Sequence, residues 1–183
     1  MGSGFYIGDR WVVTAAHVVL GSSGRPTQTR GIRVYLDSRR IITSGTLIGW
    51  STQKDVAVLR LPADPGVPAL ELRRTNFVGT GNKVYIVGYP LDIADAPLIT
   101  EGIISEFINS TSSPPPVGWV LLCDIVSASG GSGSPMLDTA GRVIGVNQIE
   151  FVDTSGVPTG LEIGITADEV LNILDALKAG SGG

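Results

Sequence analysis

The chain has 183 residues, of which 43% are hydrophobic and 16% are charged, and its formal net charge at pH 7 is −4. This balance predicts a globular chain that can bury a sizeable core and excludes a disordered one. The basic residues form no concentrated patch, so we expect no binding to nucleic acid. No apolar run approaches the roughly 18 residues of a membrane span, and we recognise no signal peptide.

The counts of cysteine and histidine limit the chemistry further. Cys123 is the only cysteine and His17 is the only histidine. One cysteine cannot form an internal disulfide, and the usual multi-histidine and cysteine-rich metal sites are excluded. We therefore expect no metal and no other cofactor. Because Cys123 ends the apolar run of residues 119–123, we predict a buried, inert thiol.

Short apolar segments separated by turns recur along most of the chain. The 25 glycines and 11 prolines favour many turns and short strands. The pattern predicts an all-β sandwich or barrel fold, in which the first two strands form a hairpin. The predicted strands are residues 4–7, 11–14, 32–36, 40–50 (one strand or two, with a bulge at Gly45), 56–61, 83–88, 98–107, 119–125, 136–137, 142–149 and 161–166.

One helix is predicted near the end of the chain, at about residues 167–178. Thr166 and Glu169 have the spacing of a capping box, in which each side chain bonds to the other residue's backbone N–H. Apolar residues at helical spacing follow, and they define one face. These residues are Val170, Leu171, Leu174 and Leu177.

The domain organisation follows from the breaks in the pattern. Prolines between residues 62 and 68 interrupt the strands and mark the end of a first half. We expect residues 1–179 to form one domain, with halves at about 1–75 and about 79–167. Residues 180–183, Gly-Ser-Gly-Gly, are expected to be a flexible tail.

The stretch Gly130–Pro135, Gly-Gly-Ser-Gly-Ser-Pro, is the first candidate for a functional site. Glycine permits unusual backbone conformations, so a serine in such a loop can expose its hydroxyl beside convergent N–H groups. Apolar strands on both sides argue against a flexible linker. Taken alone, the stretch leaves both a nucleophile loop and a linker open.

A serine hydroxyl needs a base to become a good nucleophile, and His17 is the only histidine that could serve. Such a base also needs a carboxylate that fixes its tautomer. Asp55 is the best candidate, because it stands at the mouth of an apolar strand where an unpaired charge would be costly. From the residues alone, His17 could instead be a core histidine and Asp55 a strand-entry turn residue.

Several motifs occur here in the order of a known family. They are Gly2-Ser3-Gly4-Phe5, Val13-Thr14-Ala15-Ala16-His17-Val18-Val19, Asp55-Val56-Ala57-Val58-Leu59, Val87-Gly88-Tyr89-Pro90, Gly102-Ile103-Ile104-Ser105, the Gly130–Pro135 stretch and Gly141-Arg142-Val143-Ile144-Gly145-Val146-Asn147. The chain resembles trypsin-like (chymotrypsin-fold) serine peptidases over nearly its whole length. Within that family it is most similar to the protease domain of the HtrA/Deg branch.

The resemblance implies two six-stranded antiparallel β-barrels of the chymotrypsin type, with the active site between them and a C-terminal helix. It implies that Ser132 is the nucleophile, His17 the general base and then acid, and Asp55 the residue that orients His17. The N–H groups of Gly130 and Ser132 would form the oxyanion hole. Peptide bonds of protein or peptide substrates would be hydrolysed through an acyl-enzyme.

Three departures from the trypsin pattern bear on activation and specificity. Gly131 stands where zymogens of this family have the aspartate that receives a new N-terminus, and Ser134 replaces a usual glycine. Val126 stands six residues before the serine, where trypsin needs a carboxylate. With Ile163 and Gly164 as the opposite wall, Val126 predicts an apolar pocket for small or medium aliphatic side chains, which Glu162 could modify.

Two rival functions remain open at this point. One is an esterase-like hydrolase with the same triad. The other is a latent or non-catalytic peptide-binding or chaperone-like module of the same fold. The sequence does not decide the oligomeric state or the compartment; the resemblance permits an oligomer and an extracytoplasmic location.

Overall fold

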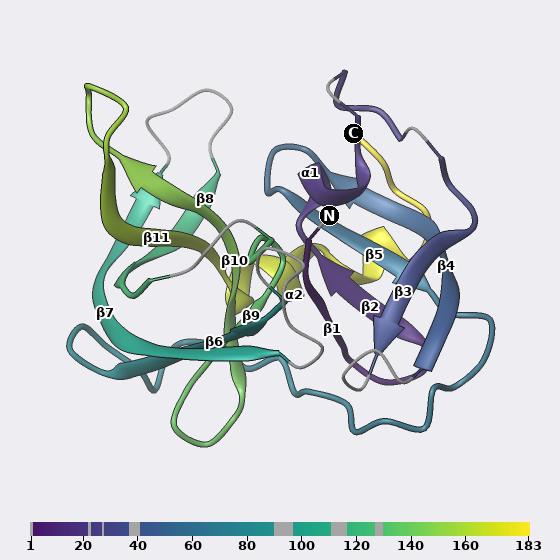
Figure 1. Cartoon of the computed structure of the whole chain (residues 1–183), viewed down its shortest axis with the longest axis horizontal. Helices are drawn as coiled ribbons and strands as arrows, with labels where there is room; N and C mark the ends of the chain where they lie inside the picture. Colours follow the sequence, from purple (N-terminus) through teal and green to yellow (C-terminus); the bar gives the residue numbers. More distant parts are fainter. Residues whose placement is uncertain are drawn as a thin grey trace.

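The structure is a computed structural model that describes residues 2–21, 23–26, 28–36, 41–89, 97–110, 117–126 and 130–183. Strands dominate these residues, and two helices accompany them (Figure 1). In chain order the elements are β1 (Gly4–Tyr6), β2 (Trp11–Thr14), α1 (Ala16–Val19), β3 (Ile32–Leu36), β4 (Ile41–Ser51), β5 (Val56–Arg60), β6 (Lys83–Gly88), β7 (Leu98–Ser110), β8 (Gly118–Asp124), β9 (Pro135–Leu137), β10 (Val143–Val152), β11 (Pro158–Thr166) and α2 (Ala167–Lys178).

The first half is an antiparallel sheet of five strands in the order β1-β2-β5-β4-β3. The central strand β5 is buried from Val56 to Leu59, as its continuous apolar run indicates. The bulge predicted at Gly45 lies elsewhere, because Gly45 pairs regularly with Ile32 and the register of β4 on β5 shifts between Leu47 and Gly49. A side chain at Gly49 would clash with the backbone of α2, so the irregular segment lets the helix approach β4 closely.

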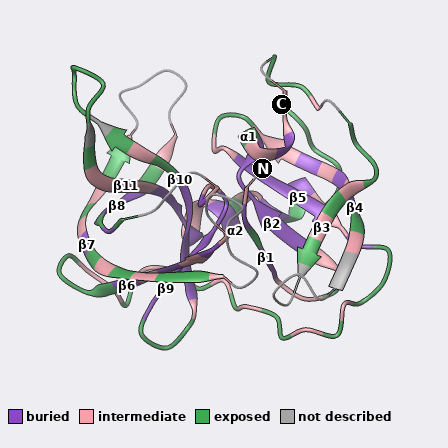
Figure 2. Ribbon diagram, in the orientation of Figure 1, coloured by how far each residue is buried: buried purple, intermediate pink, exposed green. Residues whose placement is uncertain are grey.

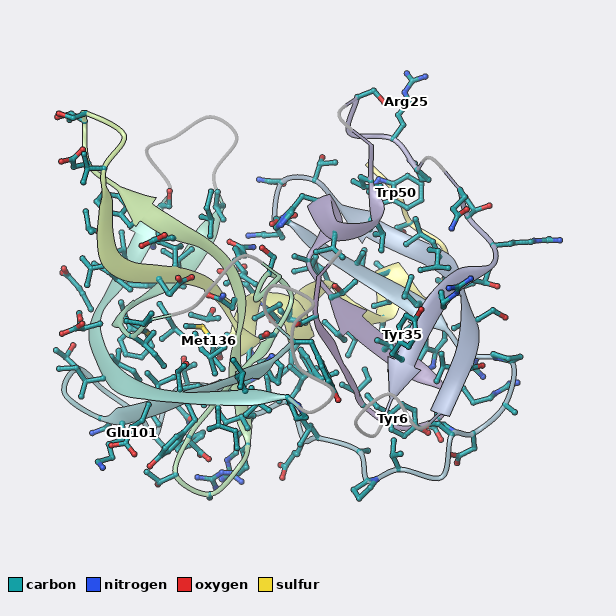
Figure 3. The ribbon with its side chains drawn as sticks, viewed as in Figure 1. Tyr6, Arg25, Tyr35, Trp50, Glu101 and Met136 are labelled. Carbon is teal, nitrogen blue, oxygen red and sulfur yellow. The ribbon has the colours of Figure 1, made fainter. Side chains whose placement is uncertain are left out.

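The second half is a closed barrel with the strand order β10-β11-β8-β7-β6-β9, in which all neighbours are antiparallel. The short strand β9 closes it by pairing with both β6 and β10. Figure 3 shows Met136, which β9 contributes, inside the ring of strands. The all-β class with a chymotrypsin-type barrel and a C-terminal helix is confirmed. The resemblance implied six strands in each half, and the first half has five among its described residues.

One hydrophobic cluster joins the two halves. Val170, Leu174 and Leu177 on α2 are buried against residues from both β5 and β10. Figure 2 shows buried residues on the strands around α2. Because apolar burial is the main favourable term in folding, this shared cluster holds the two halves together and places their loops opposite each other.

The ends of α2 differ in part from the prediction. Thr166 caps the helix by accepting a hydrogen bond from the N–H of Glu169, with a distance of 3.4 Å. The carboxylate of Glu169 bonds elsewhere, to Lys54 and to the N–H of Trp119, so only half of the capping box forms. Residues 180–183, expected to be flexible, pair with the end of β4: the N–H of Trp50 donates to Ser181 O at 2.9 Å and that of Thr52 to Gly183 O at 2.8 Å.

Neither helix in the described ranges is long and apolar enough to cross a membrane.

Candidate active site

His17 and Asp55 come together because α1 is a single turn placed directly after β2. Ala15 and Ala16 are buried, and the N–H of Ala16 donates to the carbonyl of Asp55 at 3.1 Å. The next N–H, that of His17, donates to Asp55 Oδ1 at 2.8 Å, and His17 Nδ1 lies 2.7 Å from Asp55 Oδ2. Asp55 adopts a left-handed conformation with φ of 50°, which short polar residues tolerate better than most.

This contact sets the acid–base behaviour of the ring. The hydrogen bond to the Asp55 carboxylate raises the pKa of His17 above its ordinary value of 6.5, against a smaller opposing effect of burial. The His17 side chain is 50% exposed and that of Asp55 is 28% exposed. With Nδ1 donating to the carboxylate, a neutral imidazole keeps Nε2 as its proton acceptor. The pair therefore has what a general base requires.

Backbone conformation and hydrogen bonds shape the Ser132 loop. Gly130 and Gly133 have φ values of 98° and 85°, which side chains disfavour. The N–H of Gly133 donates to Asn147 O at 2.7 Å, and that of Ser134 to Gly131 O at 3.0 Å. Within the described part of the chain, the N–H groups of Gly130 and Ser132 have no hydrogen bond.

Ser3, from the first half, anchors this loop. Its N–H donates to Ser132 O at 2.8 Å, and its hydroxyl donates to Gly130 O at 2.7 Å. The same hydroxyl accepts from the N–H of Tyr89 at 2.9 Å. The sequence alone indicated no role for Ser3 beyond its place in a family motif, because these contacts join residues up to 129 positions apart, from Ser3 to Ser132.

The hydroxyl of Ser132 donates to the carbonyl of Gln148 at 3.0 Å. Across the described ranges, no hydrogen bond joins Ser132 and His17. The side chain of Gln148 reaches the first half, where its Nε2 donates to Lys54 O at 2.6 Å. Sequence reasoning missed Gln148, for which the only available signal was its position directly after the motif that ends at Asn147.

The residues predicted to form the primary pocket lie on different faces. Val126 is 71% exposed just beyond β8. Successive residues of a strand face opposite sides: Gly164 faces the barrel interior beside Met136, whereas Ile163 packs on the core that includes α2. Glu162 shares the interior face with Gly164 and is 2% exposed. Glu162, rather than Ile163, therefore provides the side chain next to Gly164 on that face.

Cys123 is buried, as predicted. It pairs in register with Glu162 across β8 and β11. Burial, with a smaller effect of the Glu162 charge, raises the pKa of the thiol to about 12. The thiol is therefore protonated and unreactive near neutral pH.

A family model described as "Trypsin-like peptidase domain" matches residues 2–146. The chain belongs to this family. It is 33% identical to a protein named "Probable periplasmic serine endoprotease DegP-like" from Halomonas elongata, over 97% of this chain and 35% of that protein. It is also 33% identical to "Protease Do-like 1, chloroplastic" from Arabidopsis thaliana, over 96% of this chain and 39% of that protein.

Solved structures agree with this assignment. A structure described as "HtrA-type protease AlgW with decapeptide" superposes with a TM-score of 0.81 at 26% identity, over 98% of this chain and 52% of that chain. The chain is thus a trypsin-like peptidase domain that is similar in sequence and fold to HtrA-type proteases. It spans about a third of the length of the relatives above, at 35% and 39%.

Proposed function

We propose that this domain is a serine endopeptidase in which Ser132 is the nucleophile, His17 the general base and Asp55 the orienting carboxylate. The observation that carries the proposal is that the Asp55 carboxylate accepts two hydrogen bonds from His17, the only histidine, one from its backbone N–H and one from its ring. One carboxylate thus fixes both the position and the tautomer of the base, as a triad requires.

The reaction would begin when Ser132 Oγ leaves the carbonyl of Gln148 and donates to His17 Nε2. Its oxygen attacks the scissile carbonyl while His17 takes the proton, and the resulting oxyanion accepts from the N–H groups of Gly130 and Ser132. Protonated His17 then gives that proton to the leaving amine, which leaves an acyl-enzyme. Water, deprotonated by His17, hydrolyses the ester and restores the hydroxyl of Ser132.

We further propose a primary preference for small or medium aliphatic side chains. Val126 supports it, because it places an apolar side chain six residues before Ser132. The carboxylate of Glu162 on the interior face of β11 is the feature that could oppose it. Profiling of cleavage sites in a peptide library tests this preference. Cleavage mainly after Lys or Arg contradicts it, and if Glu162→Gln then abolished cleavage after Lys or Arg, the Glu162 carboxylate would be the cause of that basic preference.

A fluorophosphonate probe tests the nucleophile directly, because it labels an activated serine. We expect labelling of the wild-type domain and none in Ser132→Ala or His17→Ala. Loss of a triad member costs on the order of 10⁶ in turnover, so hydrolysis of casein should vanish in both variants. Labelling that persists in Ser132→Ala contradicts the assignment.

The alternative is a latent or peptide-binding module of the same fold, in which the Ser132 hydroxyl would stay bonded to the carbonyl of Gln148. In that case the wild-type domain binds unfolded peptides, as calorimetry would measure, while it neither reacts with the probe nor cleaves them. Turnover by the wild-type domain excludes this alternative.

The proposed substrates are proteins or peptides, and the proposed location is extracytoplasmic. The location rests on two relatives that are named periplasmic. Fractionation of the source cells with an antibody to the domain tests it, and recovery in the cytoplasm alone contradicts it.

A further inference from the structure

Lys54 occupies an unusual position for a lysine. It directly precedes Asp55 in the turn before β5, and its side chain is only 15% exposed. The ammonium donates to Glu169 Oε2 at 2.8 Å and to the carbonyl of Val117. Most lysines keep their charge in water, so this one is held by contacts with the second half of the molecule.

Glu169 completes the link from α2. Its side chain is also 15% exposed, and its second carboxylate oxygen accepts from the N–H of Trp119 at 3.1 Å. By contrast, the ion pair between Lys83 and Glu101 has side chains that are 56% and 49% exposed. Exposed pairs of that kind contribute little, whereas removing one partner of a sheltered pair leaves a charge uncompensated.

The backbone of Lys54 makes a second connection between the halves. Its carbonyl accepts from Gln148 Nε2 at 2.6 Å, and the carbonyl of Gln148 in turn accepts from Ser132 Oγ at 3.0 Å. Lys54 thus bonds to α2, to Val117 just before β8, and to β10 through Gln148. Among the described residues, it has no hydrogen bond to the side chain of His17 or Ser132.

These contacts act on the backbone conformation of Asp55. The carbonyl of Lys54 belongs to the peptide plane that joins Lys54 to Asp55, so fixing that oxygen and the Lys54 side chain restricts rotation of the plane. Asp55 sits in the left-handed region, with φ of 50°. A residue stays in such a conformation only where its surroundings hold it there.

We propose that Lys54 is a positioning residue that, through Glu169 and Gln148, holds the Asp55–His17 pair at the correct position relative to the Ser132 loop. This inference rests on the proposed function of the triad. It assigns a role to an ion pair between the halves that lies outside the reacting groups.

Activity measurements test the proposal with Lys54→Met, which keeps the length of the side chain and removes the ammonium. We expect kcat on a peptide substrate to fall on the order of 10- to 100-fold with KM nearly unchanged, because small displacements of reacting groups have effects of that size. Glu169→Gln should also lower kcat with KM nearly unchanged, but by a smaller factor. Lys54→Arg, which keeps a positive charge, should retain most of the wild-type activity.

Asp168→Asn is the matched control. Asp168 precedes Glu169 on α2 and also holds the helix to another segment, accepting from Thr75 N at 2.7 Å and Thr75 Oγ1 at 2.6 Å. Its loss should lower the melting temperature while kcat of the folded enzyme stays within about twofold of the wild type. All rates are compared at a temperature where circular dichroism shows each variant folded.

Nuclear magnetic resonance gives a readout that does not depend on turnover. His17 is the only histidine, so every imidazole signal belongs to it. The Nδ1 proton bonded to Asp55 should give a downfield resonance in the wild type and in Asp168→Asn, and it should be broadened or lost in Lys54→Met.

The outcomes separate the two proposals. Unchanged kcat and an unchanged Nδ1 resonance in folded Lys54→Met overturn the positioning role, whatever the triad does. Absence of fluorophosphonate labelling in the wild type overturns the proposed function, while the resonance still reports whether Lys54 holds the pair. Equal losses of kcat in Lys54→Met and Asp168→Asn would reduce Lys54 to general stability and also overturn the inference.

Discussion

Asp55 has the largest effect on the pKa of the His17 ring. The carboxylate accepts from both the backbone N–H and the ring of His17, and its hydrogen bond raises the pKa of the imidazole. Ser134 illustrates the opposite case, because it is fully buried and its hydroxyl has no hydrogen-bond partner in the described residues. The Asp55 carboxylate therefore changes the pKa of its neighbour, whereas the Ser134 hydroxyl is buried without a hydrogen bond in the described residues, and one substitution tests each group.

The pH dependence of activity should reflect the raised pKa of His17. The proposed mechanism needs the neutral ring of His17 as general base, so kcat/KM should rise with pH through a midpoint above the ordinary 6.5. The same shift stabilises the fold fully below the unfolded pKa, and this contribution is lost as pH rises through the folded pKa. Asp55→Asn should move the midpoint down and lower kcat by about 10⁴. A wild-type midpoint at or below 6.5 in a pH–rate profile would contradict this.

Replacing Ser134 by alanine should leave the free energy of unfolding unchanged or raise it by up to about 1 kcal/mol, because a buried hydroxyl without a partner is removed. Thr14→Val is the contrasting variant, since the buried hydroxyl of Thr14 donates to Ser3 O at 2.7 Å. Its loss should cost about 1–3 kcal/mol. Urea denaturation measures both, and a large destabilisation by Ser134→Ala would show that this hydroxyl has a partner.

At the scale of elements, α2 shows how local and distant contacts share one segment. The helix begins at Ala167 because Thr166 caps it, and Asp168 and Glu169 place negative charge in its first turn. Both carboxylates also bond to distant segments, Asp168 to Thr75 and Glu169 to Lys54. The start of the helix therefore serves at once as a helix terminus and as a junction between the halves.

The cap can be tested separately from the junction. Thr166→Ala should lower the free energy of unfolding by about 1 kcal/mol, the usual cost of losing an N-cap side chain. Thr166→Ser retains the hydroxyl and should recover most of the loss. Chemical denaturation measures both variants, and equal stabilities of Ala and Ser at this position would exclude the cap as a contributor.

At the scale of the whole molecule, the Ser132 loop is packed against the opposite half. A side chain at Gly133 would clash with Ser3 O and Thr14 Oγ1, which both belong to the first half. Together with the cluster that α2 shares with β5 and β10, this contact makes the geometry of the site depend on how the halves pack.

Two glycine substitutions separate backbone strain from packing between the halves. Gly133 and Gly141 have similar φ values of 85° and 76°, but a side chain at Gly141 would meet nothing within 4 Å. Gly141→Ala should therefore cost only about 1 kcal/mol from backbone strain. Gly133→Ala should cost several times more and abolish fluorophosphonate labelling. Equal losses of stability in the two variants would show that the contact between the halves is unimportant.

The sequence was sufficient for those features that depend on residues close together in the chain. Alternating and continuous apolar runs predicted the strands, and the helical spacing of Val170, Leu174 and Leu177 predicted α2. The motifs around His17, Asp55 and Ser132 singled out these residues, and the structure joins the first two directly. The roles of the three remain a proposal.

Other features depend on segments that meet only when the chain folds. Glu169 bonds to Lys54, Ser132 to the carbonyl of Gln148, and the last residues to β4. The face that Ile163 presents also depends on the register of β11 in the closed barrel. A local pattern can indicate that a polar group needs a partner, but the partner is set by long-range packing, because many distant residues could satisfy the same group.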